Sequence, residues 1–205
     1  MDLIYAKTVE NHKMKKDNSY KTKIKDVYDK TVKPLYIDDL IIKAKSILKS
    51  KGINSLPIVD YEEKIFGCVD RKTILVHSHS ETSFVSDIAY KPSLIAELDN
   101  LFEEIAYKML EKNLQEIPVV DNQDGKIYKG CLSEENILEE LIKNNNPILN
   151  KNISEYIITD DICCNIYDSI CKAWKMLTKK SINGLFVIND RKKIVGVLTF
   201  YDLLV

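Results

Sequence analysis

The sequence has 205 residues, of which 45% are hydrophobic and 30% charged, a balance typical of a soluble globular protein rather than a disordered one. Its 30 basic residues nearly offset its 31 acidic ones, and only Arg71 and Arg191 are arginines. Because arginine supplies the bidentate contacts of base and phosphate recognition, this composition argues against a nucleic-acid-binding protein.

The first residues of the sequence do not resemble a signal peptide. The first residues, MDLIYAKTVE, lack the basic and then apolar layout of a signal peptide, and no apolar run approaches the about 20 residues of a membrane span. We therefore expect a cytoplasmic protein without membrane contact. Residues 1–22 are polar and aperiodic, which predicts an N-terminal tail. The basic cluster between Lys13 and Lys33 could contact an anionic surface, although a solvated tail is the simpler interpretation.

The first folded segment predicts strand, helix, strand, turn, strand and helix. Residues 24–27 (IKDV) predict a short opening strand. Apolar residues recur at helical spacing over 41–48, with Asp38 placed to cap this helix and Gly52 to end it. Residues 53–75 (INSLPIVDYEEKIFGCVDRKTIL) then predict two strands around a polar turn, followed by a helix.

The same pattern recurs in the next segment. Residues 85–88 predict a second opening strand, and residues 114–138 (LQEIPVVDNQDGKIYKGCLSEENIL) repeat the two strands with a longer turn. The helix between them has a wide apolar stripe, formed by Leu98, Leu101, Phe102, Ile105, Met109 and Leu110. A closing helix is predicted over residues 134–143, before a linker at 144–147. Its predicted inward residues are Ile137, Leu138 and Leu141.

A third segment aligns with the first without a gap. Residues 153–156 predict the opening strand, and residues 182–204 (INGLFVINDRKKIVGVLTFYDLL) predict strands over 185–188 and 194–198. The helix between them is predicted to face the core with Ile170, Ala173, Trp174 and Leu177. The opening strands are spaced along the chain as the strand pairs are, which is independent evidence for a threefold internal repeat.

The five cysteines do not predict a disulfide framework. Cys68 and Cys131 stand at the repeat position that Val197 fills in the third segment, so we expect them to be small buried hydrophobic residues. The other three lack a C-x-x-C pair and a following histidine, and are Cys163, Cys164 and Cys171. A reduced protein is the simpler interpretation.

The threefold pattern I-x-x-h-P-V-V-D, turn, h-x-G-h-h and T/S-x-x-D resembles the CBS domain. The resemblance implies a stand-alone, prokaryotic-type protein with three CBS motifs, here called repeats 1, 2 and 3, over residues 23–83, 84–146 and 147–205. It implies an α+β fold of tandem β-α-β-β-α repeats, in which small mixed sheets each pack on two helices. CBS motifs pair as Bateman modules. Repeats 1 and 2 can form one, whereas the partner of repeat 3 is either a fourth repeat or a copy from a second chain.

The resemblance also implies that grooves between paired motifs bind an adenosine-containing ligand, such as AMP, ADP, ATP or S-adenosylmethionine. The candidate ligand-binding residues belong to repeat 3 and are Thr199, Asp202, Ile182, Asn183, Gly184, Ile157, Thr159 and Asp160. A weaker second site is predicted in repeat 2, from Ser133, Asn136, Glu116 and Ile117. An aspartate can accept hydrogen bonds from both ribose hydroxyls, and a threonine at a helix start can hold a phosphate. The resemblance further implies that main-chain groups just before the h-P-V-V strand contact the adenine edge. In repeat 3 this edge is Ile182, Asn183 and Gly184, with residues 157–160 on the other wall.

Each of these segments has a second interpretation. Ser, Thr and Asp are also the preferred N-caps of helices, so the T/S-x-x-D segments can be structural. Repeat 1 inverts the pattern, with Asp70 where a phosphate would lie, and its site is expected to be poor. Asp160 and Asp161 would tolerate a cationic sulfonium better than a polyphosphate, or they are turn residues.

Catalysis and metal binding have little support. His77 and His79 lack a fixed third ligand, so no metal site is predicted, and no motif of a hydrolase, P-loop or dinucleotide-binding enzyme occurs. We expect a regulatory homodimer that requires no cofactor and is not an enzyme, with an unidentified effector protein as a further partner. A dimerisation scaffold with decayed ligand sites is the alternative, and an active site across a dimer groove is the third hypothesis.

Overall fold

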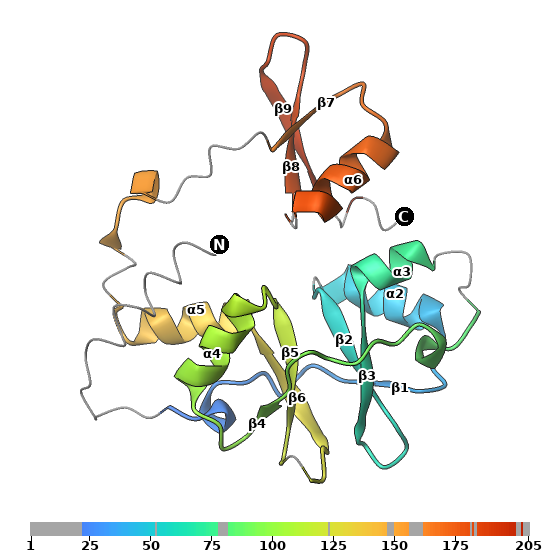
Figure 1. Cartoon of the computed structure of the whole chain (residues 1–205), viewed down its shortest axis with the longest axis vertical. Helices are drawn as coiled ribbons and strands as arrows, with labels where there is room; N and C mark the ends of the chain where they lie inside the picture. The colour runs from blue at the N-terminus through green and yellow to red at the C-terminus, as the bar shows by residue number, and fades with distance from the viewer. Residues whose placement is uncertain are drawn as a thin grey trace.

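The computed structural model describes residues 22–51, 53–77, 82–122, 124–146, 150–155, 162–180, 182, 184–199 and 202. It contains three successive units of alike topology, which correspond to repeats 1, 2 and 3 (Figure 1). Within the described residues, no helix has the length and apolar character needed to cross a membrane.

Within the described residues, each repeat holds one three-stranded mixed sheet. The strands are β1 (Leu35–Tyr36), β2 (Ser55–Val59) and β3 (Ile65–Asp70) in repeat 1, β4 (Ala96–Glu97), β5 (Glu116–Val120) and β6 (Tyr128–Ser133) in repeat 2, and β7 (Cys163–Asn165), β8 (Gly184–Ile188) and β9 (Ile194–Thr199) in repeat 3. The first strand of each sheet is parallel to the middle strand, and the third is antiparallel to it. The predicted α+β class with small mixed sheets is confirmed.

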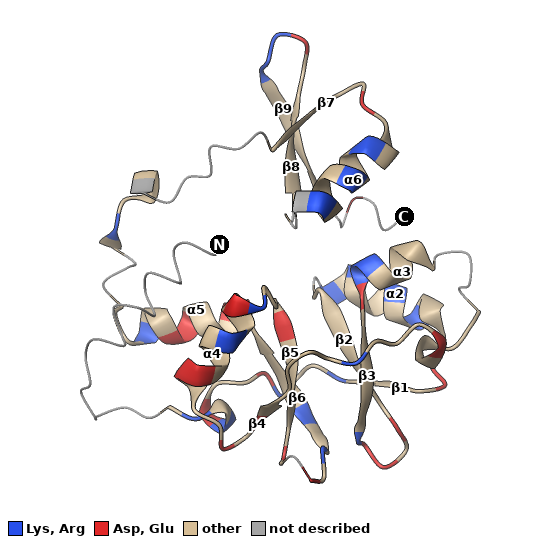
Figure 2. Ribbon diagram, viewed as in Figure 1, with Lys and Arg blue, Asp and Glu red and all other residues tan. Residues whose placement is uncertain are grey.

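The helices follow the repeat as well. They are α2 (Ile41–Lys51) and α3 (Arg71–Val76) in repeat 1, α4 (Phe102–Glu111) and α5 (Glu134–Lys143) in repeat 2, and α6 (Ile170–Lys180) in repeat 3. The predicted bounds of the closing helix α5 are confirmed. Figure 2 shows basic and acidic segments interspersed over all three repeats, in keeping with the net charge of −1.

The predicted opening strands are wrong. The three segments form short 3₁₀ turns, η1 (Ile24–Asp26), η3 (Val85–Asp87) and η5 (Ile153–Glu155). In η1 the side chain of Asp26 accepts a hydrogen bond from the Lys23 N–H, and in η3 that of Asp87 accepts one from the Phe84 N–H, both at 3.3 Å. Such a local side-chain bond favours a tight turn over a strand. The actual first strands, β1, β4 and β7, are too short to show a period in the sequence.

Some predictions about the helices are also wrong. Asp38 does not cap α2, because the helix begins at Ile41; Asp39 instead accepts from the Tyr36 N–H at 2.9 Å. The predicted end at Gly52 lies outside the described residues. Leu138 is 46% exposed rather than inward. Trp174 is half-buried and does not belong to the apolar cluster of repeat 3, which centres on Cys164, Ala173, Leu177 and Leu185.

Repeats 1 and 2 exchange their opening turns. Ile24, at the start of repeat 1, is fully buried in the core of repeat 2, which is built from α4, α5 and the β4–β6 sheet. Val85, at the start of repeat 2, is fully buried in the core of repeat 1. Figure 1 shows the blue turn η1 beside β4 and α4. Burial of each of these side chains contributes about 1.5–3 kcal/mol, so the exchange locks the two repeats together.

Candidate functional site

The two polar residues predicted to hold a ligand in repeat 3 lie side by side. Thr199 ends β9, and Asp202 follows it by one helical turn. Oδ2 of Asp202 accepts from the Thr199 N–H at 2.7 Å and from its hydroxyl at 2.8 Å. These hydrogen bonds favour the ionised carboxyl and lower the pKa of Asp202. The site therefore presents an anionic acceptor held in place by a hydroxyl.

The corresponding residues of repeat 2 form a reciprocal cap. The N–H and hydroxyl of Ser133 both donate to Oδ1 of Asn136 at 3.0 Å, and the Asn136 N–H donates to the Ser133 hydroxyl oxygen at 3.3 Å. In repeat 1, Oδ1 of Asp70 accepts from the Thr73 N–H at 2.7 Å. In repeats 1 and 2 these residues thus satisfy helix-start donors, as the N-cap interpretation predicts.

The predicted adenine-contacting edge of repeat 3 is described in part. Gly184 begins β8 and pairs directly with Thr199, so this main-chain segment and the polar pair lie at one end of the sheet. Ile182 packs against the core of repeat 3, and its N–H donates to the Leu177 carbonyl oxygen at 3.2 Å. The other predicted members lie outside the described residues, namely Asn183, Ile157, Thr159 and Asp160, as does Asp161.

The equivalent main-chain edge of repeat 1 is already occupied by a side chain of repeat 2. Oε2 of Glu116 accepts from the Asn54 N–H at 3.1 Å and from the Ser55 N–H at 2.8 Å. Glu116 begins β5 directly opposite Ser133. Its neighbour Ile117 is only 2% exposed, because its side chain packs in the core of repeat 2. The Glu116 carboxylate therefore accepts the hydrogen bonds of the main-chain amides that, by resemblance, would contact a ligand.

The environment of Glu116 balances opposing effects. Burial raises the pKa of this carboxyl, while the Ser55 and Asn54 N–H groups and the Arg71 guanidinium favour its ionised form and offset part of the shift. The net direction is upward, so removal from water is the largest effect. Glu116 was predicted as a possible ligand contact, and the structure shows that its partners are protein amides.

Arg71 is a site-shaping residue that the sequence reasoning missed. It is 4% exposed, and its guanidinium donates to the carbonyl oxygens of Leu48, at 3.1 Å, and of Ile53. These bonds tie the end of α2 to the segment that precedes Asn54. The available signal was its rarity, since it is one of only two arginines and stands at the start of a predicted helix.

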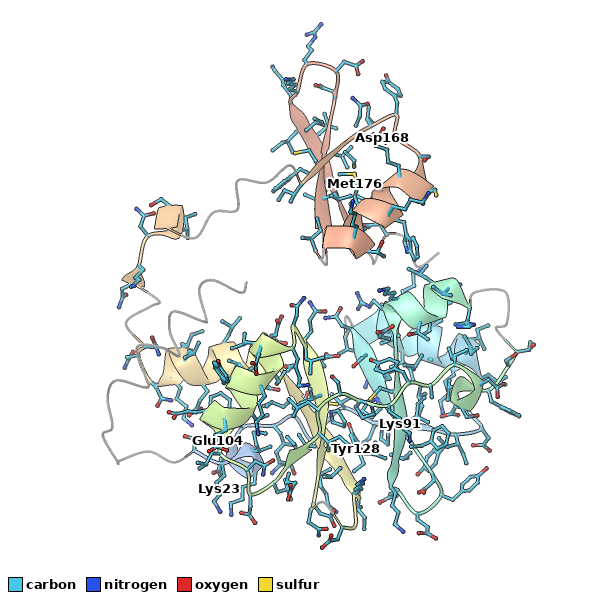
Figure 3. All side chains as sticks on the ribbon, viewed as in Figure 1. Lys23, Lys91, Glu104, Tyr128, Asp168 and Met176 are labelled. Carbon is cyan, nitrogen blue, oxygen red and sulfur yellow. The ribbon has the colours of Figure 1, made fainter. Side chains whose placement is uncertain are left out.

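Buried polar side chains line the contact between repeats 1 and 2. Tyr128, marked in Figure 3, donates from its hydroxyl to the Val32 carbonyl oxygen at 2.9 Å. Cys68 and Cys131 are 3% and 4% exposed, which confirms that they are buried small residues. Burial raises the pKa of Cys68 to about 12 and also raises that of Cys131, so both thiols remain protonated at neutral pH. Neither is suited to act as a nucleophile.

The described residues contain no group of three or more His, Cys, Asp or Glu side chains arranged to hold a metal ion. His77 lies in the turn after α3, and His79 is outside the described residues.

Comparison with known sequences identifies the repeat. The model of the family described as "CBS domain" matches residues 24–80, 85–143 and 153–205. The homoserine O-acetyltransferase of Methanococcus vannielii is 33% identical over 118 residues, which make up 56% of this chain and 24% of that protein. The chain thus spans about a quarter of this relative's length.

Solved structures share the fold. Protein MJ1225 of Methanocaldococcus jannaschii superposes with a TM-score of 0.77 at 17% identity, over 89% of this chain and 71% of that one. The CBS domain pair of protein MJ0100, solved in complex with 5′-methylthioadenosine and S-adenosyl-L-methionine, has a TM-score of 0.51 at 26% identity, over 62% of this chain and 100% of that one.

Proposed function

Because the chain belongs to the CBS-domain family, we propose that it is a cytoplasmic regulatory protein that binds an adenosine-containing ligand. It senses the ligand and does not catalyse a reaction, and it needs no further cofactor. AMP, ADP, ATP and S-adenosylmethionine are the candidate ligands. The likeness to the MJ0100 domain pair, which was solved with two adenosine compounds, supports this ligand class.

The observation that carries the proposal is the Thr199–Asp202 pair of repeat 3. The ionised carboxylate, held 2.8 Å from the Thr199 hydroxyl, can accept hydrogen bonds from ribose hydroxyls. Thr199, at the end of β9, is the residue proposed to contact a phosphate of the ligand. Gly184, paired with Thr199, places main-chain groups at the same end of the sheet.

Repeats 1 and 2 are less suited to the same ligand. In repeat 1, Glu116 already accepts from the Asn54 and Ser55 N–H groups, and Asp70 stands where a phosphate would lie. In repeat 2, Glu134 and Glu135 place negative charge in the first turn of α5. The proposed ligand site is therefore in repeat 3.

We also propose a homodimer in which repeat 3 pairs with repeat 3 of a second copy, completing a composite groove near Thr199 and Asp202. Exposed apolar side chains on repeat 3 support this pairing, since Ile170 is 71% and Val197 57% exposed. A soluble protein rarely leaves such side chains uncovered together.

Native mass spectrometry of the purified protein tests both proposals at once. The expected result is a dimer that carries a ligand with the mass of an adenosine compound, either as purified or after addition of AMP, ATP or S-adenosylmethionine. A dimer that binds none of these would contradict sensing and favour the scaffold function, which the closed edge of repeat 1 supports. Conversion of a bound nucleotide to product would contradict the non-enzymatic assignment.

A further inference from the structure

The exchange of opening turns between repeats 1 and 2 follows one bonding scheme used twice. In one crossing, the Ile24 N–H donates to the Asn100 carbonyl oxygen at 3.1 Å, and the Phe102 N–H donates to that of Thr22 at 3.0 Å. In the other, the Val85 N–H donates to the Asp39 carbonyl oxygen at 2.8 Å, and the Ile41 N–H donates to the Ser83 carbonyl oxygen at 3.0 Å. An opening turn thus always binds the start of the first helix of the partner repeat.

A second set of bonds follows directly after each turn. The main chain of Asp29 exchanges two hydrogen bonds with Cys131 on β6, at 2.8 and 3.0 Å, and Tyr90 exchanges two with Cys68 on β3, at the same distances. The strand residue before each cysteine is a glycine because the main chain of the other repeat lies against it. A Cβ on Gly67 would lie 2.9 Å from the Tyr90 carbonyl oxygen, and one on Gly130 would overlap that of Asp29.

Repeat 3 has the same receiving surface, but it is open. The register of its sheet places Gly196 and Val197 where repeat 1 has Gly67 and Cys68. A Cβ on Gly196 would meet nothing within 4 Å. Val197 is 57% exposed against 3% for Cys68.

The start of α6 repeats this contrast. Ile170 opens α6 as Ile41 opens α2, yet it is 71% exposed where Ile41 is fully buried. The loop before it already has the receiving conformation, since Oδ2 of Asp168 accepts from the Asn165 N–H at 2.9 Å, as Asp39 does from Tyr36. Figure 3 marks Asp168 at this end of repeat 3.

The segment that fills this surface in the other repeats is an opening turn, and the third opening turn is uncovered. Ile153 leads η5 as Ile24 leads η1, and it is 78% exposed where Ile24 is fully buried. In repeats 1 and 2 an opening turn packs on the partner repeat rather than on its own. A second copy of repeat 3 offers both the missing turn and the missing surface, and reciprocal exchange closes on a twofold axis.

We propose that two copies of this chain exchange the η5 turn, so that Ile153 of each copy is buried in repeat 3 of the other. This inference rests on the proposed homodimer and names its contacts. The Ile153 N–H donates to the partner's Asp168 carbonyl oxygen, and the partner's main chain lies against Gly196. The exchange brings the second copy to the sheet edge of repeat 3, where β9 leads to Thr199.

The test compares Ile153→Asp with Ile142→Asp by light scattering at micromolar concentration. Both isoleucines are largely exposed within one chain, at 78% and 60%, so neither change should unfold it. The wild type and Ile142→Asp are expected to be dimers, and Ile153→Asp a monomer. A dimer that survives Ile153→Asp overturns the exchange.

Gly196→Ala separates the exchange from any other dimer. Because the added Cβ meets nothing within one chain, circular dichroism and thermal unfolding at a concentration where the protein is monomeric should not change. The exchanged dimer loses main-chain bonds at this edge, so its dissociation constant should rise about 10- to 100-fold. A wild-type monomer overturns both the homodimer and the exchange. This outcome includes the case in which a different protein, and not a second copy, covers the surface of repeat 3. A wild-type dimer that tolerates both substitutions keeps the homodimer and overturns only the exchange.

Discussion

Replacing Glu116 tests whether its carboxylate closes the main-chain edge of repeat 1. Glu116→Ala removes the acceptor of two amides, Asn54 N–H and Ser55 N–H, bonded at 3.1 and 2.8 Å. Hydrogen bonds to a charged group contribute about 1.5–3 kcal/mol each. Two effects offset part of this loss. The substitution removes the cost of burying a carboxylate, and water can replace it as the partner of the half-buried amides. We expect the free energy of unfolding to fall by about 1–3 kcal/mol.

Glu116→Gln separates the charge from the acceptor. The amide oxygen can still accept from Asn54 and Ser55, so its cost at pH 7 should be below about 1 kcal/mol. Burial raises the pKa of Glu116 in the folded protein, so the folded state holds this proton more tightly than the unfolded state does. The resulting stabilisation is complete below the unfolded pKa, about 4.3, and is lost as the pH rises through the folded pKa. The stability of the wild type relative to Glu116→Gln should therefore decrease from about pH 4 toward pH 7.

Urea unfolding at 25 °C and one protein concentration measures both effects, followed by far-ultraviolet circular dichroism. Glu139→Ala is the matched control, because Glu139 is exposed on α5 and should change stability by less than about 0.5 kcal/mol. A Glu116→Ala variant as stable as this control would refute the role of the two amide bonds. A wild-type advantage over Glu116→Gln that grows with pH would refute the assigned direction of the pKa shift.

Three further predictions concern the proposed ligand. Asp202→Ala should weaken adenosine-ligand binding about 10- to 100-fold in titration calorimetry, whereas Asp70→Ala should not; equal losses would contradict the assignment to repeat 3. The resemblance implies that Asp160 and Asp161 flank the proposed ligand groove. AMP or S-adenosylmethionine should then raise the melting temperature at least as much as ATP, and a far larger shift with ATP would disprove this. Gly184→Glu places a glutamate where Glu116 stands in repeat 2, so its side chain should block the ligand site of repeat 3 and abolish binding, while light scattering still detects the dimer. Unchanged affinity would show that a glutamate at this position does not block the site.

The sequence predicts best those parts of the fold that depend on neighbouring residues. The two strands and polar turn of each repeat, and the bounds of α5, follow from short-range alternation and capping. Ser133 and Asn136 form their predicted cap because both groups lie within one turn of the chain. The Thr199–Asp202 contact is predictable for the same reason.

The errors arise where a distant part of the chain decides the conformation. The segment at Ile24 is short and has an apolar residue at each end, so it resembles a strand in the sequence. In the structure the local bond of Asp26 and the main-chain bonds to Leu98 and Asn100 in repeat 2 together hold it as a turn. Likewise, Glu116 and Asn54 are far apart in sequence, so no local pattern reveals that one binds the other. Ile170 belongs to the predicted stripe of α6, but the surface that would cover it lies outside its own repeat.

One position explains why three similar repeats need not share one function. Ser55, Glu116 and Gly184 each begin the middle strand of their sheet, opposite Asp70, Ser133 and Thr199. At this position only glutamate is long enough to reach the amides of the neighbouring repeat, as it does at Asn54 and Ser55. Glycine has no side chain to reach across, so a second copy of repeat 3 cannot close the first one's edge in this way. In the pairing of repeats 1 and 2, the carboxylate of Glu116 therefore occupies the amides at the edge of repeat 1. A pairing of repeat 3 with a second repeat 3 would leave the corresponding amides available to a ligand.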